Sequence, residues 1–258
     1  MTNRAENLGN QLFEALRGRQ PIAPITDTHD DISIEEAYRA SLQMLARREA
    51  EGEKVIGKKI GITSEAVQTM LNVDRPDFGF LTDAMWIKDG QVPMGPMIAP
   101  RAEAEIAFRL KESLKGPGIK AADVLQATET IMPCFEIVDS RIADWKIKIQ
   151  DTIADNASCG VYVLGEAEID PRGLDLTQLK ATVSKNGEFL SEGYSSAVQG
   201  SPLNSVAWLA NTLGELGIPF LAGEIILSGS LVPLEPVTAG DKMSVTIEKL
   251  GTCDVAFI

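Results

Sequence analysis

The chain has 258 residues, of which 44% are hydrophobic and 24% charged, and its formal net charge is −13 at pH 7. This composition is typical of a water-soluble globular protein that is long enough to bury a large core. The acidic balance argues against nucleic acid or an anionic membrane surface as a partner, because a basic patch would be expected for either.

The sequence predicts neither a membrane span nor a secretory signal. No run of about 18 apolar residues is present, so we expect no membrane span. The N-terminus has no apolar stretch before a small-residue cleavage site, so we expect no secretory signal. Cys134, Cys159 and Cys253 lie far apart and form no CxxC pair. We therefore expect reduced thiols in a cytoplasmic protein.

The N-terminal segment predicts two helices. Leu8, Leu12 and Leu16 recur at helical spacing, and the run over 33–52 begins with a capping box between Ser33 and Glu36. Four segments follow: a glycine-interrupted strand in "KVIGKKIGIT", a short helix in "TSEAVQTML", a turn-rich loop in "RPDFGFLTDAMW" and a hairpin in "WIKDGQVP" that turns at Asp89-Gly90.

Strands dominate the rest of the chain. They are predicted over 101–111, 133–140, 160–165, 179–185 with a turn at Asn186-Gly187, 224–229 and 242–257. Helices are predicted over "AADVLQATETI" and over "SPLNSVAWLANTLGELG", where Ser201 is the N-cap, Pro202 opens the first turn and Gly217 ends the helix. The pattern indicates an α+β fold, with an N-terminal helical region (1–82) and a mostly antiparallel β-rich domain (83–258).

The stretch "PRAEAEIAFRL", residues 100–110, alternates with period two, as a half-buried strand does. Its apolar face consists of Ala102, Ala104, Ile106, Phe108 and Leu110. Glu103 and Glu105 point to the other face, roughly 7 Å apart along the strand. Like charges on one face of a strand repel each other, so this pair needs a compensating group.

Glu136 suggests what that group is. It interrupts the apolar stretch 131–138, which predicts a strand buried on both faces, where a lone Glu is costly unless it is paired or bound to a cation. Three carboxylates together would suit a hard divalent ion such as Mg²⁺ or Mn²⁺, whereas zinc prefers histidine or cysteine. The pattern leaves one alternative open: the pair on the preceding strand lies on a solvated face beside Arg101 and Arg109.

Two neighbouring lysines, Lys58 and Lys59, stand in "VIGKKIG", so their side chains leave opposite faces of the strand. One of them could enter a pocket, where desolvation lowers the pKa of a lysine. The residues alone favour a surface strand with both side chains extended to water. Asp77, in "RPDFGF", has the sequence context of an ordinary turn.

A polar turn precedes the strand at 160–165. Asp155, Asn156 and Ser158 lie in it, and such residues form turns for structural reasons, although loops at strand ends are also where sites are built. The only histidine, His29, stands in the polar loop "TDTHDD", where a solvated position is favoured over a catalytic role.

Several of these segments together carry a family resemblance. In chain order they are "KVIGKKIGIT", "RPDFGFLTDAM", "RAEAEIAF", "MPCFEIVDSRIADWKIKIQDTIADNASCGVYVLG", "GSPLNSVAWLANTL" and "GEIILSGSLVPLEPVTAGD". The sequence resembles the 2-hydroxypenta-2,4-dienoate (2-keto-4-pentenoate) hydratases of aromatic meta-cleavage pathways, in the fumarylacetoacetate hydrolase superfamily. The resemblance covers nearly the whole chain and implies a fumarylacetoacetate hydrolase-like core.

The resemblance implies metal-binding or catalytic roles for five residues. Glu103, Glu105 and Glu136 correspond to the family's ligands for a divalent metal, Mg²⁺ or Mn²⁺. Lys59 corresponds to its proton-transfer residue, and Asp77 would line the same pocket as a second catalytic residue.

Ser158 is implied to lie near the substrate, and we extend that substrate-binding expectation to Asp155 and Asn156 of the same loop. Superfamily members that hydrolyse carbon–carbon bonds use a histidine-acid pair to activate water. This chain has only His29, which counts against a hydrolase.

The implied activity is a metal-dependent hydration of 2-hydroxypenta-2,4-dienoate, through the 2-oxo-3-enoate, to 4-hydroxy-2-oxopentanoate. One alternative is the sister activity, 4-oxalocrotonate decarboxylase, and another is a non-catalytic domain that binds metal or a partner. Family analogy also implies a homo-oligomer and association with the decarboxylase or aldolase of the pathway.

Overall fold

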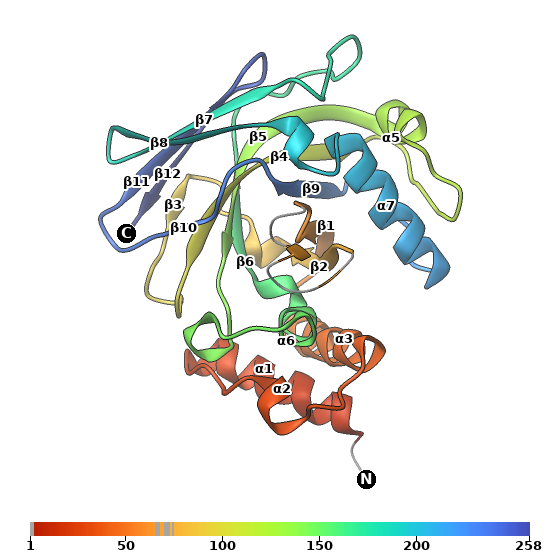
Figure 1. The fold of residues 1–258 in the computed structure, drawn as a ribbon, viewed down its shortest axis with the longest axis vertical. Coiled ribbons are helices and arrows are strands. Elements are labelled where there is room, and N and C mark those ends of the chain that lie inside the picture. Colours follow the sequence, from red (N-terminus) through yellow and green to blue (C-terminus); the bar gives the residue numbers. More distant parts are fainter. Residues whose placement is uncertain (1–2, 65–67, 70–72, 74) are drawn as a thin grey trace.

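The structure is a computed structural model that describes residues 3–64, 68–69, 73 and 75–258. Two β-sheets and two groups of helices make up the fold, with the first helices gathered at one end of the molecule (Figure 1). This arrangement confirms the predicted α+β class. The expected helix over "TSEAVQTML" falls mostly on residues outside those described.

The N-terminal helices are α1 (Arg4–Gly18), α2 (Ile25–Thr28) and α3 (Ile34–Ala50). The capping box of α3 forms as predicted, because the Ser33 hydroxyl accepts from Glu36 N and the Glu36 carboxylate accepts from Ser33 N. These helices and α6 (Ile149–Ala154) share a core that includes Leu12 and Phe13.

A strongly curved sheet forms the centre of the fold (Figure 1). Its strands, in spatial order, are β2 (Asp77–Thr82), β1 (Val55–Gly61), β9 (Ile225–Ser230), β4 (Arg101–Leu110), β5 (Thr128–Val138) and β6 (Cys159–Leu164), and the short β10 (Glu235–Pro236) also pairs with β4. Only β1 and β9 pair in parallel; the other described pairs in this sheet are antiparallel.

A second sheet lies on the outer side of the first. Its order is β3 (Gln91–Val92), β12 (Gly251–Phe257), β11 (Lys242–Ile247), β7 (Lys180–Lys185) and β8 (Glu188–Tyr194). The main hydrophobic core joins it to β4 and β5 and to the helices α5 (Ala121–Ala127) and α7 (Pro202–Glu215). The N-cap of α7 is Ser201, and Gly217 beyond its end has φ +78°, so both predicted boundary signals are confirmed.

Two predictions between residues 75 and 92 are wrong. "RPDFGFLTDAMW" contains the strand β2 as well as a turn, and all six residues of β2 are buried. "WIKDGQVP" does turn at Gly90, which has φ +69°, but it forms no hairpin. No hairpin forms because the segments on the two sides of the turn pair with different sheets. Trp86 bridges in parallel to Tyr162 on β6, and β3 pairs in parallel with β12.

Two other predicted boundaries also change. The helix over "AADVLQATETI" ends at Ala127, because the β-branched residues that follow join β5. The single strand over 242–257 is the hairpin of β11 and β12, which turns at Lys249 and Gly251, both with positive φ.

β1 and β2 lie within the region 1–82 and are hydrogen-bonded into the same sheet as β9 and β4. The division into regions 1–82 and 83–258 stays a prediction. Within the described residues, no helix combines the length and the apolar character needed to cross a membrane.

Candidate active site

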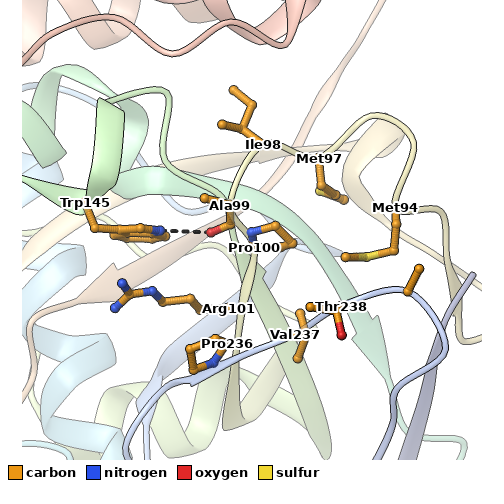
Figure 2. Close-up of a pocket in the computed structure, with 11 residues that line it drawn as sticks. Met94, Met97, Ile98, Ala99, Pro100, Arg101, Trp145, Pro236, Val237 and Thr238 are labelled. Atoms are coloured by element: carbon orange, nitrogen blue, oxygen red, sulfur yellow. Dashed lines mark hydrogen bonds between the residues drawn. The ribbon is translucent and has the colours of Figure 1, made fainter.

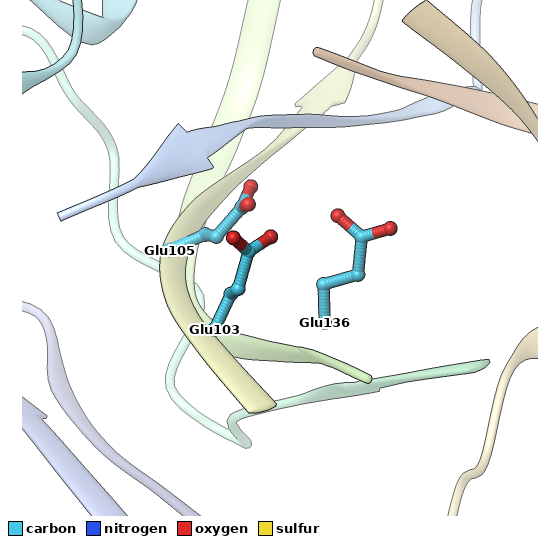
Figure 3. Close-up of side chains that lie close together, drawn as sticks. All are labelled: Glu103, Glu105 and Glu136. Atoms are coloured by element: carbon cyan, nitrogen blue, oxygen red, sulfur yellow. The ribbon is translucent and has the colours of Figure 1, made fainter. Parts of the chain in front are cut away.

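Three glutamates meet on the inner face of the curved sheet, which we define as the face that carries Glu103, Glu105 and Glu136. Glu103 on β4 is directly opposite Glu136 on β5 in the antiparallel register, and Glu105 lies two residues further along β4. Their side chains point into one space (Figure 3), and one carboxylate oxygen from each lies within 4.8 Å of the others. The alternate residues of β4 face the main core, as predicted.

Two members of the cluster are buried, Glu103 is half-buried, and the cluster is short of hydrogen bonds. Glu105 and Glu136 are 0% and 1% exposed. Glu105 Oε2 accepts from Gly229 N at 2.8 Å, while Glu105 Oε1 has no hydrogen-bond partner. Neither oxygen of Glu136 accepts a well-oriented hydrogen bond, although Lys59 Nζ lies 3.2 Å from Oε1. A solvated strand face, the alternative left open by the sequence, is therefore wrong for this part of β4.

Burial and mutual repulsion act on all three glutamates. Burial, with the nearby charge of Glu136, raises the pKa of Glu103 to about 7. Burial and its two neighbours raise the pKa of Glu105 well above its ordinary value. Burial also raises the pKa of Glu136, against the opposing effect of Lys59. Unsatisfied buried carboxylate oxygens in an oxygen-only set fit a hard divalent ion such as Mg²⁺ or Mn²⁺.

Lys59 and Asp77 complete the group from the neighbouring strands β1 and β2. Lys59 is 2% exposed and is ion-paired with Glu136. Asp77 is 1% exposed; its Oδ2 accepts from Thr152 Oγ1 at 3.1 Å and its Oδ1 has no hydrogen-bond partner. A Cβ on Gly61 would lie 2.2 Å from Asp77 Oδ1 and 3.5 Å from Lys59 Nζ, so glycine at this position leaves room for both side chains.

The charge state of Lys59 differs from the sequence expectation. Burial by itself lowers its pKa, but Glu136, Cys159, Asp77 and Glu103 raise it, and the net shift is upward. The expected lowering of a desolvated lysine pKa is therefore wrong for this arrangement, because carboxylates surround the ammonium group. Burial raises the pKa of Asp77.

Lys58 points to the opposite face, as the alternation predicts, but it is also buried. Its Nζ lies 2.5 Å from the Glu224 carboxylate, with both side chains less than 10% exposed. The interpretation of β1 as a surface strand with two solvated lysines is wrong. Burial lowers the pKa of Lys58, against the effect of Glu224.

The loop at 155–158 is hydrogen-bonded to β2 and supports the active site from that side. Asn156 Oδ1 accepts from Phe80 N at 2.8 Å and Asn156 Nδ2 donates to Phe80 O at 3.0 Å, so its amide extends the outer edge of β2, the strand of Asp77. Asn156, Ala157 and Ser158 all have φ between 52° and 53°. Three successive left-handed residues indicate a backbone held by its surroundings.

Arg141 stabilises the backbone conformation of this loop. It is fully buried, its Nε lies 2.5 Å from Asp155 Oδ1, and it donates to the backbone carbonyls of Asp139, Asp155 and Cys159. Ser158 Oγ donates to Asp155 Oδ2 at 3.3 Å. Burial raises the pKa of Asp155 to about 6, against Arg141.

The structure thus brings together Lys59, Asp77, Glu103, Glu105 and Glu136. Asp155, Asn156 and Ser158 lie next to this group through β2, and their role in binding substrate stays a prediction.

Sequence reasoning missed Arg141, Glu224 and Cys159. A charged residue directly after a buried strand, as in "VDSR", is a signal that could have drawn attention to Arg141. The partnership of Lys58 and Glu224, separated by 166 residues, has no such signal. The three cysteines are unpaired, as expected, and His29 ends α2.

Comparison with known proteins places this site in a class. Residues 54–257 match the family described as "Fumarylacetoacetate (FAA) hydrolase C-terminal". The fold and the match together define a member of the fumarylacetoacetate hydrolase superfamily.

The relatives narrow the assignment. The chain is 59% identical over 255 residues to a 2-hydroxyhexa-2,4-dienoate hydratase of Comamonas testosteroni, with 98% of this chain and 97% of the relative covered. It is 45% identical over 253 residues to a 2-keto-4-pentenoate hydratase of Paraburkholderia xenovorans, with 98% and 94% covered.

Among solved structures, the 4-oxalocrotonate decarboxylase from Pseudomonas putida G7, complexed with magnesium and adipate, is 34% identical and has a TM-score of 0.95, with 100% of this chain and 99% of that chain covered. Since sequence identity to the hydratases is much higher, the chain belongs to the 2-hydroxypentadienoate (2-keto-4-pentenoate) hydratases of this superfamily.

Proposed function

We propose that this protein is a divalent-metal-dependent hydro-lyase that converts 2-hydroxypenta-2,4-dienoate to 4-hydroxy-2-oxopentanoate in the meta-cleavage catabolism of aromatic compounds. The observation that supports it most is the cluster of half-buried Glu103 with buried Glu105 and Glu136, to which Lys59 is ion-paired at 3.2 Å. The names of the hydratases that are 45% to 59% identical support the same reaction.

The three glutamates would hold a Mg²⁺ or Mn²⁺ ion. When bound, such an ion supplies Lewis acidity toward the oxygens of a 2-hydroxy or 2-oxo acid. The magnesium named in the related decarboxylase structure agrees with this donor set.

Lys59 is assigned to the first proton transfer. The substrate loses its C2 hydroxyl proton and gains a proton at C5, which converts the dienol into the 2-oxo-3-enoate. The Lys59 ammonium group holds a proton beside the glutamates, with its Nζ 3.2 Å from Glu136 Oε1.

Asp77 is assigned to the water addition. In that step the oxygen of water bonds to C4, and C3 gains a proton. Asp77 Oδ1 has no hydrogen-bond partner, so it can accept a proton from the attacking water. Its raised pKa brings it closer to the range in which a carboxylate acts as a general base near neutrality. Ser158, Asp155 and Asn156 are kept as candidates for substrate contact.

Absorbance spectroscopy tests the proposal. The purified protein should bleach the conjugated dienoate band in the presence of Mg²⁺, lose this activity on chelation and recover it with Mg²⁺ or Mn²⁺. Full activity in protein shown by elemental analysis to be metal-free would contradict metal dependence. Release of CO₂ from the dicarboxylic analogue would instead indicate the decarboxylase, and neither signal would indicate a binding domain.

The proposal extends to assembly. We infer a homo-oligomer and association with the decarboxylase or aldolase of the same pathway by family analogy. Light scattering coupled to size-exclusion chromatography, with and without the partner enzymes, measures both.

A further inference from the structure

β4 carries two arginines on the inner face, one on each side of the glutamate pair. Arg109 is ion-paired, because its Nη2 lies 2.7 Å from Glu168 Oε1. Arg101, two residues before Glu103, has no acidic partner in the part of the chain that the structure describes. Its guanidinium carbon lies 4.5 Å from the ring centroid of Trp145 instead. The guanidinium edge of Arg101 is therefore not paired with a carboxylate of the described residues, although the protein has a net charge of −13.

A groove of about 460 Å³ opens in front of Arg101. Figure 2 shows Arg101 below the Trp145 ring, with the methionines of the preceding loop on the opposite side of the groove. The apolar walls are formed mainly by Met94, Met97, Pro100, Trp145, Pro236 and Val237. The groove therefore combines hydrocarbon walls with one cationic group.

Specific contacts hold the groove in shape. The Asp139 carboxylate accepts from Ile98 N at 3.0 Å and from Ala99 N at 2.7 Å, which fixes the loop before β4. Trp145 Nε1 donates to Ala99 O at 2.9 Å. Asp144 and Trp145 have φ of 58° and 55°, so the backbone is in the left-handed region where the indole is placed over the guanidinium. Costly backbone conformations that persist tend to mark functional positions.

The chemistry of this arrangement favours a carboxylate. A guanidinium that stacks through its face keeps its N–H edge available for a bidentate carboxylate contact. Arg101 and Glu103 leave the same face of β4, and their Cα atoms are roughly 7 Å apart. The groove lining contains none of the three glutamates, so a small organic acid held by Arg101 would lie beside the cluster, one residue pair along β4 from Glu103.

We propose that Arg101 and the groove form a carboxylate-binding subsite for short unsaturated organic acids at the entrance of the active site. The proposal deepens the hydratase function and rests on it. The carboxylate has two possible sources: the C1 carboxylate of the dienoate on its way to the glutamates, or the second carboxylate of a dicarboxylic substrate.

Steady-state kinetics on two substrates test the subsite. We compare wild type, Arg101→Met, Arg101→Lys and the control Arg109→Met, which changes an arginine on the same strand and face, with the five-carbon dienoate and its dicarboxylic analogue. For Arg101→Met we expect KM to rise about tenfold with kcat retained, because one charged hydrogen-bonded contact is lost. Arg101→Lys should recover part of the loss, and Arg109→Met should leave KM unchanged.

The two sources give different patterns. An equal rise in KM for both substrates supports capture of the C1 carboxylate, and a rise only for the dicarboxylic analogue supports the distal carboxylate. Unchanged KM for both substrates, or an equal change in Arg109→Met, overturns the proposal.

A binding measurement separates this proposal from the hydratase assignment. The binding of pentanoate and of adipate to metal-free protein is measured by tryptophan fluorescence. The variant Trp145→Phe shows which part of the fluorescence change comes from Trp145. Binding that is weakened in Arg101→Met supports the subsite even if the protein hydrates neither substrate. Equal binding by wild type and Arg101→Met overturns it even if hydration is confirmed.

Discussion

The change Glu105→Gln separates a metal site from an ordinary buried carboxylate. Glutamine keeps the size of the side chain, and its amide oxygen can still accept from Gly229 N, the bond that Glu105 Oε2 makes at 2.8 Å. What disappears is one negative charge. The variant should therefore bind Mg²⁺ far more weakly than wild type, while its metal-free form should be more stable than metal-free wild type.

The expected gain in stability follows from the spacing of the carboxylates. Two unit charges at the 4.8 Å limit of the cluster repel each other by about 3 kcal/mol at an effective dielectric constant of about 20. Glu105 repels Glu103 and Glu136 and attracts Lys59, so the net gain is about one such repulsion when all of these groups are ionised, and it is smaller to the extent that Glu105 is protonated. For a chain of this length, about 3 kcal/mol corresponds to a rise in Tm of roughly 6 °C.

Thermal melts at pH 8 with and without Mg²⁺ measure both effects, and isothermal titration calorimetry measures the Mg²⁺ affinity. Glu129→Gln is the control, because Glu129 is an exposed glutamate on β5, the strand of Glu136. If Glu105→Gln retains the full Mg²⁺-induced rise in Tm, or if its metal-free form melts lower than wild type, the reasoning about the cluster is refuted.

The remaining predictions concern proton transfer, pH and the support of β2. Lys59→Met should lower kcat by on the order of 10²-fold. Lys58→Met should leave kcat nearly unchanged but lower the free energy of unfolding by about 3–5 kcal/mol, because Glu224 would lose its buried partner. Equal losses of kcat in the two variants would refute the assignment of Lys59. Because the Glu103 pKa is raised to about 7 in the folded state, the metal-free fold binds protons more tightly than the unfolded chain. Its free energy of unfolding should therefore fall as pH rises from about 4.5 through 7, which pH-dependent chemical denaturation measures, and a rise over this range would be the wrong sign. Asn156→Leu removes two hydrogen bonds to Phe80 and should lower both stability and kcat; an increase in KM alone would indicate direct substrate contact instead.

Local patterns in the sequence pointed to the three glutamates but left a solvated face open for Glu103 and Glu105, and only the family resemblance assigned all three to one metal site. Alternation assigns Glu103 and Glu105 to one face of a strand whatever its neighbours are, and the apolar surroundings of Glu136 indicate its burial without any knowledge of its partner. The register that sets Glu136 opposite Glu103 depends on how β4 and β5 pair, over a connection that includes α5. That part could not be read from residue types.

The wrong predictions for β2 and for the segments beside Asp89-Gly90 also arise from strand pairing that residue types do not show. "PDFG" has the composition of a turn, yet β2 forms because β1 supplies a hydrogen-bonding partner on one side and Asn156 on the other. Asp89-Gly90 makes the expected turn, but the strands on either side pair with β6 and β12 instead of each other. Local signals predicted where the chain turns, and tertiary pairing decided which strands formed.

The two lysines of β1 illustrate how one dipeptide serves two purposes. Their opposite directions follow from the pleat alone, but each finds a glutamate that is distant in the sequence: Lys58 meets Glu224 and Lys59 meets Glu136. The pair formed by Lys58 is balanced, one charge against one, and fixes the start of β9 against β1.

The charge balance on the inner face is different, and it links metal, protons and stability. Lys59 faces four carboxylates there, those of Asp77, Glu103, Glu105 and Glu136, so the group carries a net charge of −3 when all are ionised. Such a charge cannot persist in a buried space without cations or protons, and the raised carboxylate pKa values show that protons are one means of relief. A divalent cation would be the other, and it would leave a residual charge of −1. Protons and metal should therefore compete for the same oxygens. It follows that Mg²⁺ affinity should weaken as pH falls below about 7, over the same range in which the metal-free fold becomes more stable.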